Sequence, residues 1–507
     1  MNTSSPGRVL VEYATPSRPA PARREHPHAG GGWAVGLTLV ALGALGFVAA
    51  VSFVHTPVGT VTESSGIAVD WGAIGTMLVF TAAVAGWVTD KLDDTFVALT
   101  AAAALVVLGT LDPEDLFTTL GAEPIWLLVV AFVLAAGVNR TGLPTRLAIA
   151  LAARATTARQ LTHLLTAGLV ITALLVPSTS GRAALVLPVF TALAGAFAEH
   201  RRLVRALALL FPSVVLLSAI ATLVGAGAHL VTSQVLAGTT GAGIGFGRWL
   251  LLGLPLAVVS SHLATELILL VHTRRRDRRV PLRVDAAALR EQVGVGHRVG
   301  REELRAAALL GIVIALWSTG PLHGFPPALV ALAGALLITS PRLGTVRLGT
   351  AVSEVPWALL LFMAATAALG TALTSSGAAS WLAGHVLDVG SGTGLLILVI
   401  VLSVAAHLLV QSRSARSSVL IPLVIPAATA VGMNPAALAF ASTAGAGFCH
   451  TLPSSAKPVA MFARVEGVTT YDTRDLAALA APLGLLTAAL VLLCSLTLWP
   501  YLGLPLY

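Results

Sequence analysis

The chain has 507 residues, of which 56% are hydrophobic and only 11% are charged, and its mean hydropathy is +0.87. Soluble domains carry about 25% charged residues, so this composition excludes a soluble protein folded around one core. The formal net charge of +8 does not indicate nucleic acid, because the arginines cluster in loops between apolar runs, as in multi-pass membrane proteins. We therefore expect a lipid bilayer around the chain and no nucleic acid as a partner.

Taken in chain order, residues 1–32 are rich in Pro and Arg, and we expect a disordered cytoplasmic tail there. The first transmembrane helix and its loop occupy 33–68; the run is too long for a signal-peptide core, so it should remain as an anchor. An all-α polytopic membrane protein follows, because apolar runs of about 18 residues can cross the hydrocarbon core. We expect about eleven transmembrane helices, near residues 34–54, 69–88, 94–110, 118–140, 206–235, 247–271, 303–319, 325–340, 356–376, 434–463 and 476–499.

Two further apolar pairs, 160–196 and 393–431, are interrupted by serine-rich segments. If the first pair enters and leaves on one side, the basic loops before the chain centre all share the side of the N-terminus. The loops on the other side, at 55–68, 111–117 and 236–245, then contain no Lys or Arg. This distribution predicts re-entrant hairpins with the N-terminus in the cytoplasm, in the inner (plasma) membrane of the cell.

The second hairpin should enter from the opposite side, because its flanks lack Lys and Arg. We therefore expect two inverted repeats, 69–272 and 302–499, joined by a cytoplasmic linker at 273–301 and followed by a tail at 500–507. The hairpins share a pattern of Ser, Ser, Arg and Pro at equal offsets. Its members are Ser178, Ser180, Arg182 and Pro188 in the first, and Ser412, Ser414, Arg416 and Pro422 in the second.

A hairpin tip at membrane depth survives only where it is buried in protein or lines a wet cavity. Its hydroxyls and free N–H groups suit an anion. Arg182, Arg413, Arg416 and Lys457 lie in or beside such interruptions, and carboxylates near them are scarce. A bound anion could supply the missing charge, although Arg182 and Arg416 could instead snorkel to a hydrated vestibule. The candidate substrate-binding residues are Ser178, Thr179, Ser180, Arg182, Ser412, Arg413, Ser414, Arg416, Ser454, Ser455, Ala456 and Lys457.

The span after each hairpin is also interrupted, at 222–229 and at 451–458. His229, His407 and His450 lie near these breaks. A histidine titrates near neutral pH and could couple proton movement to transport, but a buried histidine can equally be a hydrogen-bonded structural residue. We expect no cofactor, since no metal-ligand or redox motif is present.

The order of serine tip and broken helix, twice and inverted, resembles the divalent anion–sodium symporter family. The resemblance covers about 69–499 and rests on Ser178-Thr179-Ser180, on Ser412-Arg413-Ser414 and on the glycine-rich break at 222–229. It implies a homodimer with an elevator-type movement and with di- or tricarboxylates or sulfate as substrates. It also implies sodium sites, of which Ser178 and Gly225 would keep a weak one. The family's tip asparagines are replaced by Thr179 and Arg413, and a guanidinium group repels Na⁺, so we expect altered or absent sodium coupling.

The leading hypothesis is therefore a secondary active transporter of a small multivalent anion, with Na⁺ or H⁺ as the coupling ion if there is one. A cation or proton antiporter of the same superfamily is an alternative that would need acids inside the membrane. A membrane-embedded enzyme is a further alternative, but no catalytic motif such as a nucleophile elbow or a zinc site is present.

Overall fold

The computed structural model describes residues 71–89, 91–296, 298–386 and 391–507. The predicted tail at 1–32 and the first predicted span at 33–68 lie outside the described residues. Within these ranges the fold is helical, apart from two isolated β-bridges. Eight helices of the described part are long and apolar enough to cross a membrane. Several predicted spans are shorter helices or broken ones, so the predicted number of about eleven is not settled by length alone.

The described helices of the first half follow each other in the order α2 (Trp71–Thr89), α3 (Asp94–Val107), α4 (Pro113–Thr118), α5 (Glu123–Arg140), α6 (Leu143–Ala152), α7 (Ala158–Leu175), α8 (Thr179–Ala196), α9 (Arg201–Leu217), α10 (Gly227–Thr240) and α11 (Phe246–His272). Those of the second half are α14 (Arg301–Ser318), α16 (Pro327–Ile338), α17 (Leu348–Ser353), α18 (Trp357–Ser375), α19 (Ala378–Val386), α20 (Gly392–Ala405), α21 (Arg413–Ala430), α22 (Pro435–Gly445), α23 (Lys457–Ala463) and α24 (Thr473–Leu493). The linker holds α12 (Arg275–Arg278) and α13 (Ala286–Val293). The short helices α15 (Gly320–His323) and α25 (Trp499–Tyr501) have no counterpart in the first half.

The packing of the helices repeats along with their order. Helix α3 packs against α18, and α16 packs against α5; α10 packs against α21, and α23 packs against α8. When each helix is replaced by its counterpart in the other half, the α3–α18 contact becomes the α16–α5 contact, and the α10–α21 contact becomes the α23–α8 contact. This exchange is expected for two units related by a twofold axis. The contacts therefore support two structural repeats, while their opposite insertion in the membrane remains a prediction.

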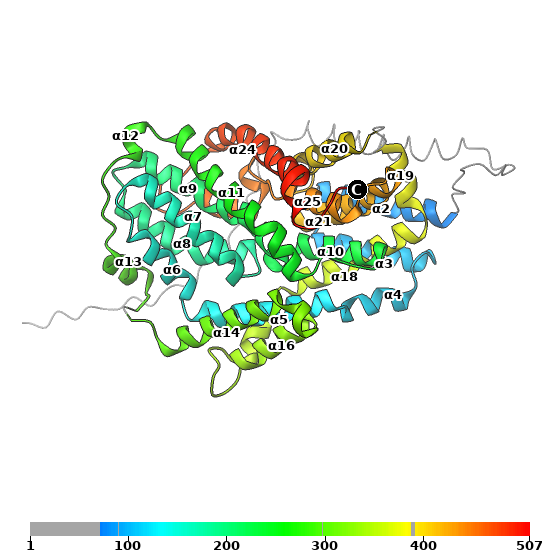
Figure 1. The fold of residues 1–507 in the computed structure, drawn as a ribbon, viewed down its shortest axis with the longest axis horizontal. Helices are drawn as coiled ribbons and strands as arrows, with labels where there is room; N and C mark the ends of the chain where they lie inside the picture. Colours follow the sequence, from blue (N-terminus) through cyan, green and yellow to red (C-terminus); the bar gives the residue numbers. More distant parts are fainter. Residues whose placement is uncertain (1–70, 90, 297, 387–390) are drawn as a thin grey trace, which may run out of the picture.

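The buried apolar side chains form two clusters. One includes α6 to α9 with α13 and α23, and the labelled helices α6 to α9 and α13 lie toward one end of the molecule (Figure 1). The other includes α2, α3, α5, α10, α16 and α18 to α22. Helix α11 contributes to both, with Trp249 in the second cluster and Ile268 in the first. This long helix therefore joins the two apolar regions.

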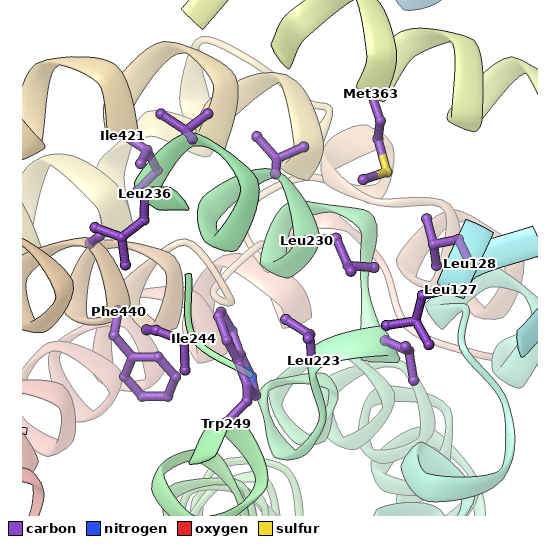
Figure 2. Close-up of a cluster of buried hydrophobic side chains, with 14 of the residues drawn as sticks. Leu127, Leu128, Leu223, Leu230, Leu236, Ile244, Trp249, Met363, Ile421 and Phe440 are labelled. Atoms are coloured by element: carbon purple, nitrogen blue, oxygen red, sulfur yellow. The ribbon is translucent and has the colours of Figure 1, made fainter. Parts of the chain in front are cut away.

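The broken part of the first half is held by close packing (Figure 2). Leu223 and Leu230 on either side of the break lie with Leu127 and Leu128 of α5 in the same buried cluster. The Trp249 indole N–H of α11 donates a 3.0 Å hydrogen bond to the Ile220 carbonyl. A Cβ added at Gly253 would lie 2.0 Å from the same carbonyl oxygen. Only glycine allows α11 to approach the break this closely.

Candidate anion site

Both hairpins turn at a serine that caps the second arm. The Ser178 hydroxyl accepts a 3.1 Å hydrogen bond from the Gly181 N–H at the start of α8. The Ser412 hydroxyl accepts a 3.3 Å bond from the Ala415 N–H at the start of α21. A serine at this position satisfies one of the four free N–H groups of a helix start. The first serine of the shared sequence pattern thus has the same structural role in both hairpins.

The two broken helices also have the same local geometry. In the first, Thr222 and Ala226 are extended (φ/ψ −133°/149° and −156°/150°) and enclose a single 3₁₀ turn. In the second, Leu452 and Ala456 are extended (−127°/153° and −159°/146°) around an equivalent turn. The helix resumes at Gly227 in one half and at Lys457 in the other. Lys457 therefore occupies the position that a glycine holds in the first repeat.

The tips and the breaks meet at one cavity of about 500 Å³. The start of α3 and the start of α18, two helices that pack against each other, also line this cavity. Eleven of the twelve sequence-predicted binding residues line it: Ser178, Thr179, Ser180, Ser412, Arg413, Ser414, Arg416, Ser454, Ser455, Ala456 and Lys457. Binding by these residues remains a prediction, but the structure brings them together as expected.

Arg182 is the predicted residue that does not line this cavity. Its side chain is completely buried (0% exposed). The guanidinium group donates to the carbonyls of Leu169 (2.7 Å) and Val215 (3.0 Å) and to the hydroxyls of Thr172 (3.1 Å) and Ser218 (2.6 Å). These acceptors come from α7 and from the end of α9, where free carbonyls and the helix dipole favour a cation. The expectations that Arg182 binds a substrate anion or snorkels to a vestibule are thus replaced by a structural role.

Arg416 is the equivalent residue of the second half and has a related environment. It is 1% exposed, and it donates to the Phe448 carbonyl (3.3 Å) and to Cys449 Sγ (2.7 Å), just beyond the end of α22. In contrast to Arg182, it lines the cavity, and its Nε has no hydrogen-bond partner among the described residues. Cys449 is a buried free cysteine, and its contact with Arg416 could not be seen in the sequence.

Arg413 joins the two halves. Its Nη2 donates to the Gly447 carbonyl (2.8 Å) after α22 and to the Leu216 carbonyl (3.2 Å) near the end of α9. Both carbonyls belong to helix ends, which carry partial negative charge. Its Nη1 is buried and has no partner within the described ranges. The guanidinium group therefore lies where two negative helix ends converge.

Carboxylates do not neutralise these cations directly. Among the described residues, Arg413, Arg416 and the exposed Lys457 form no ion pair with Asp or Glu. Asp93 and Asp94, at the start of α3, do line the cavity, and the Asp93 carboxylate caps that helix. Sequence reasoning missed both. Their place at the start of a predicted span was visible in the sequence, but their approach to the hairpin tips depends on helix packing.

The three histidines near the breaks do not line the 500 Å³ cavity. His229 bonds the Thr222 carbonyl through Nδ1 (2.9 Å) and stacks on Trp249. His407 bonds the Val404 carbonyl, and the His450 Nδ1 accepts from the Cys449 N–H. Each histidine thus has a structural bond, and a role in proton coupling remains a prediction.

The weak sodium site suggested at Ser178 and Gly225 remains a prediction. Ser178 lines the cavity, whereas Gly225 does not. A Cβ at Gly225 would lie 2.1 Å from the Ala219 carbonyl oxygen, so this glycine is needed to fold the break tightly.

A helical membrane fold with two repeats, each bringing a capped hairpin and a broken helix to one cavity, defines a multi-pass membrane transporter. The chain belongs to the family described as "sodium:sulfate symporter transmembrane region", whose model matches residues 47–505. It is therefore a transporter and not an enzyme.

Individual relatives agree with this assignment. The chain is 26% identical to a membrane protein of Cupriavidus necator over 74% of both chains. It is 22% identical to the sodium-dependent dicarboxylate transporter SdcS of Staphylococcus saprophyticus, covering 80% of this chain and 82% of that one. Among solved structures, the YdaH transporter of Alcanivorax borkumensis matches with a TM-score of 0.50 at 19% identity, over 80% of this chain and 90% of the other, which supports the fold.

Proposed function

We propose that the chain is a secondary active transporter of a small multivalent anion, either a di- or tricarboxylate or sulfate. The observation that supports this most directly is the convergence of Arg413, Arg416 and Lys457 on one cavity without carboxylate ion-pair partners in the described part. A charge at membrane depth is costly unless a partner is present. An anionic cargo would be that partner.

The dimensions and lining of the cavity agree with such a cargo. Sites for small molecules have volumes of about 300–1,000 Å³, and the cavity has about 500 Å³. Serine and threonine hydroxyls from both tips can donate to carboxylate or sulfate oxygens. The family description names sulfate, and the staphylococcal relative is named for dicarboxylates.

Arg413 supports altered or absent sodium coupling. Two helix ends that direct carbonyls toward one point would suit a free cation, but here the guanidinium group already bonds both Leu216 and Gly447. The protein's own cation would thus replace one coupling ion. An elevator movement, a homodimer and an inner-membrane location with a cytoplasmic N-terminus belong to the same proposal and rest on the family resemblance and on the distribution of arginines.

A cation or proton antiporter is the second candidate, and Asp93 and Asp94 are the observation in its favour, because acids in the cavity could carry a cation. The three cations that line the same cavity make this the less favoured alternative.

Uptake of labelled anions into proteoliposomes tests the proposal. Succinate, citrate and sulfate would be supplied separately, with the sodium gradient, the pH gradient and the internal anion varied one at a time. We expect uptake of at least one of these anions, with little dependence on sodium. Proteoliposomes that take up none of them, but that move protons or Na⁺ in exchange for one another, would establish the antiporter instead.

A further inference from the structure

A second hollow lies away from the anion site, at the end of α5. It has a volume of about 780 Å³ and is lined by Thr339, Ser340, Gly344, Thr345 and the residues around them, with Arg140 and Arg347 as its charged members. No carboxylate lines it, and neither arginine forms an ion pair with a described residue. The charge of this hollow is therefore wholly positive.

The segment that forms its wall is fixed and not loosely exposed. The Thr345 hydroxyl donates a 2.7 Å bond to the Gly137 carbonyl of α5, and the Thr345 N–H donates a 2.9 Å bond to the Ile338 carbonyl. A Cβ added at Gly137 would lie 2.6 Å from the Ile338 side chain, and one at Gly344 would lie 2.5 Å from the Ser340 carbonyl. Both glycines thus permit a tight contact, and the two arginines are presented from a preformed frame.

The surroundings indicate what can reach this hollow. Arg140 ends α5, which is among the helices able to cross a membrane, so we expect it at the boundary between hydrocarbon and water. Leu348, which lines the hollow, and Leu343, which precedes the lining residue Gly344, are each about half exposed. Exposed leucines next to arginines are typical of the lipid interface. Apolar chains and a charged group can therefore be accommodated side by side.

We propose that Arg140 and Arg347 bind a phosphate group, which the position of the hollow assigns to the headgroup of an anionic phospholipid. Two guanidinium groups match phosphate oxygens with paired hydrogen bonds. Basic hollows between membrane helices recognise anionic headgroups in this way. The Thr339 and Thr345 hydroxyls already donate to protein carbonyls, so the arginines supply the donors for the phosphate. The inference does not depend on which cargo the transporter carries.

Native mass spectrometry of the purified full chain tests it, with phosphatidylglycerol and phosphatidylcholine offered in equal amounts. The R140Q/R347Q variant removes the site. R275Q/R279Q is the matched control, because it removes the same charge from exposed positions in the linker. Since each basic residue near an anionic surface contributes about fivefold in affinity, retention of phosphatidylglycerol should fall by about 25-fold in R140Q/R347Q, which removes two arginines, and stay unchanged in the control.

Two further arms separate the sources of phosphate and the effect of misfolding. If inorganic phosphate binds the wild type through the same arginines and the two lipids are retained equally, the phosphate chemistry stands but the headgroup assignment is overturned. R140K/R347K keeps the charge and should bind less tightly than the wild type but more tightly than the glutamine variant. Equal retention of both lipids by the wild type, with no phosphate binding, overturns the proposal without any variant and leaves the anion-transport proposal untouched.

Discussion

Arg182, Arg413, Arg416 and Lys457 all lie in or beside interruptions of apolar segments, but they differ in their hydrogen-bond partners. Arg182 has protein acceptors for its guanidinium group, Arg413 and Arg416 each keep one nitrogen without a partner, and Lys457 is exposed to the cavity. An arginine whose three nitrogens all have protein acceptors contributes stability, whereas one with an unpartnered nitrogen can still bind a ligand. The degree of internal hydrogen bonding therefore separates structural from binding cations.

Replacement of Arg182 by Met should destabilise the protein without changing its selectivity. The substitution leaves buried carbonyls and hydroxyls unpaired, which costs about 2–4 kcal/mol. Thermal unfolding in detergent, followed by tryptophan fluorescence, should show a clear loss in Tm. Lys457→Met is the counterpart, and there we expect a normal Tm with about tenfold weaker anion affinity. A reversed pattern would mean that the roles of the two residues have been exchanged.

Arg413→Ala should nearly abolish anion uptake, by at least about tenfold, because it removes the charge from the point where the ends of α9 and α22 converge. The alanine leaves room for a free cation. We therefore expect millimolar guanidinium, and to a smaller extent Na⁺, to restore part of the uptake. Arg275→Ala, in the linker, is the control and should be insensitive to both. If neither ion changes the activity of a well-folded R413A protein, the proposal that Arg413 replaces a coupling cation is wrong.

At the scale of the elements, the interruptions were predictable and their surroundings were not. Serine, glycine and proline act locally, so the hairpin tips and the broken helices could be located from the sequence. The acceptors of Arg182, by contrast, come from α7 and α9, and they reach it only through helix packing. Asp93 and Phe362 enter the cavity from α3 and α18, far from either tip in the sequence. Such contacts are set by tertiary structure, which residue patterns do not encode.

The close approach of α11 to the first break gives a prediction at this scale. In Gly253→Ala, the new methyl group would meet the Ile220 carbonyl at 2.0 Å and push α11 away from the break. We expect a loss of most transport activity and a lower Tm. Gly311→Ala in α14 is the control, since a Cβ there meets nothing within 4 Å, and the change should be neutral or slightly stabilising. Full activity of G253A would show that the spacing of these elements is not needed for function.

At the scale of the whole molecule, the described helices of the two halves pack with exchanged partners, and this explains why one site receives parts from both. The element order and the paired motifs of the two halves could be read from the sequence. The first predicted span lies outside the described residues, and the membrane orientation of the halves still depends on the positive-inside argument.

A carrier with fixed positive charge in its cavity should cross more readily when loaded. Moving an uncompensated cation through a low-dielectric barrier is costly, and a bound anion reduces that cost. Uptake of labelled anion should therefore be faster, by about tenfold, into proteoliposomes that contain unlabelled anion than into empty ones. Counterflow measured at zero membrane potential is the relevant experiment. Equal rates into loaded and empty vesicles would instead indicate that the empty carrier returns freely.

The two broken helices are alike in backbone, yet the residue that follows each turn is Gly227 in one and Lys457 in the other. Arg413 and Arg416 also come from the second half, whereas the first half contributes hydroxyls, main chain and the acids Asp93 and Asp94 but no cation to the lining. Two halves with similar backbones thus enclose a cavity whose cations all come from the second half. A cargo with one more strongly anionic end should therefore bind in a single orientation, with that end toward the second half. Contacts of the other end with the first half would then select for the length and shape of the cargo.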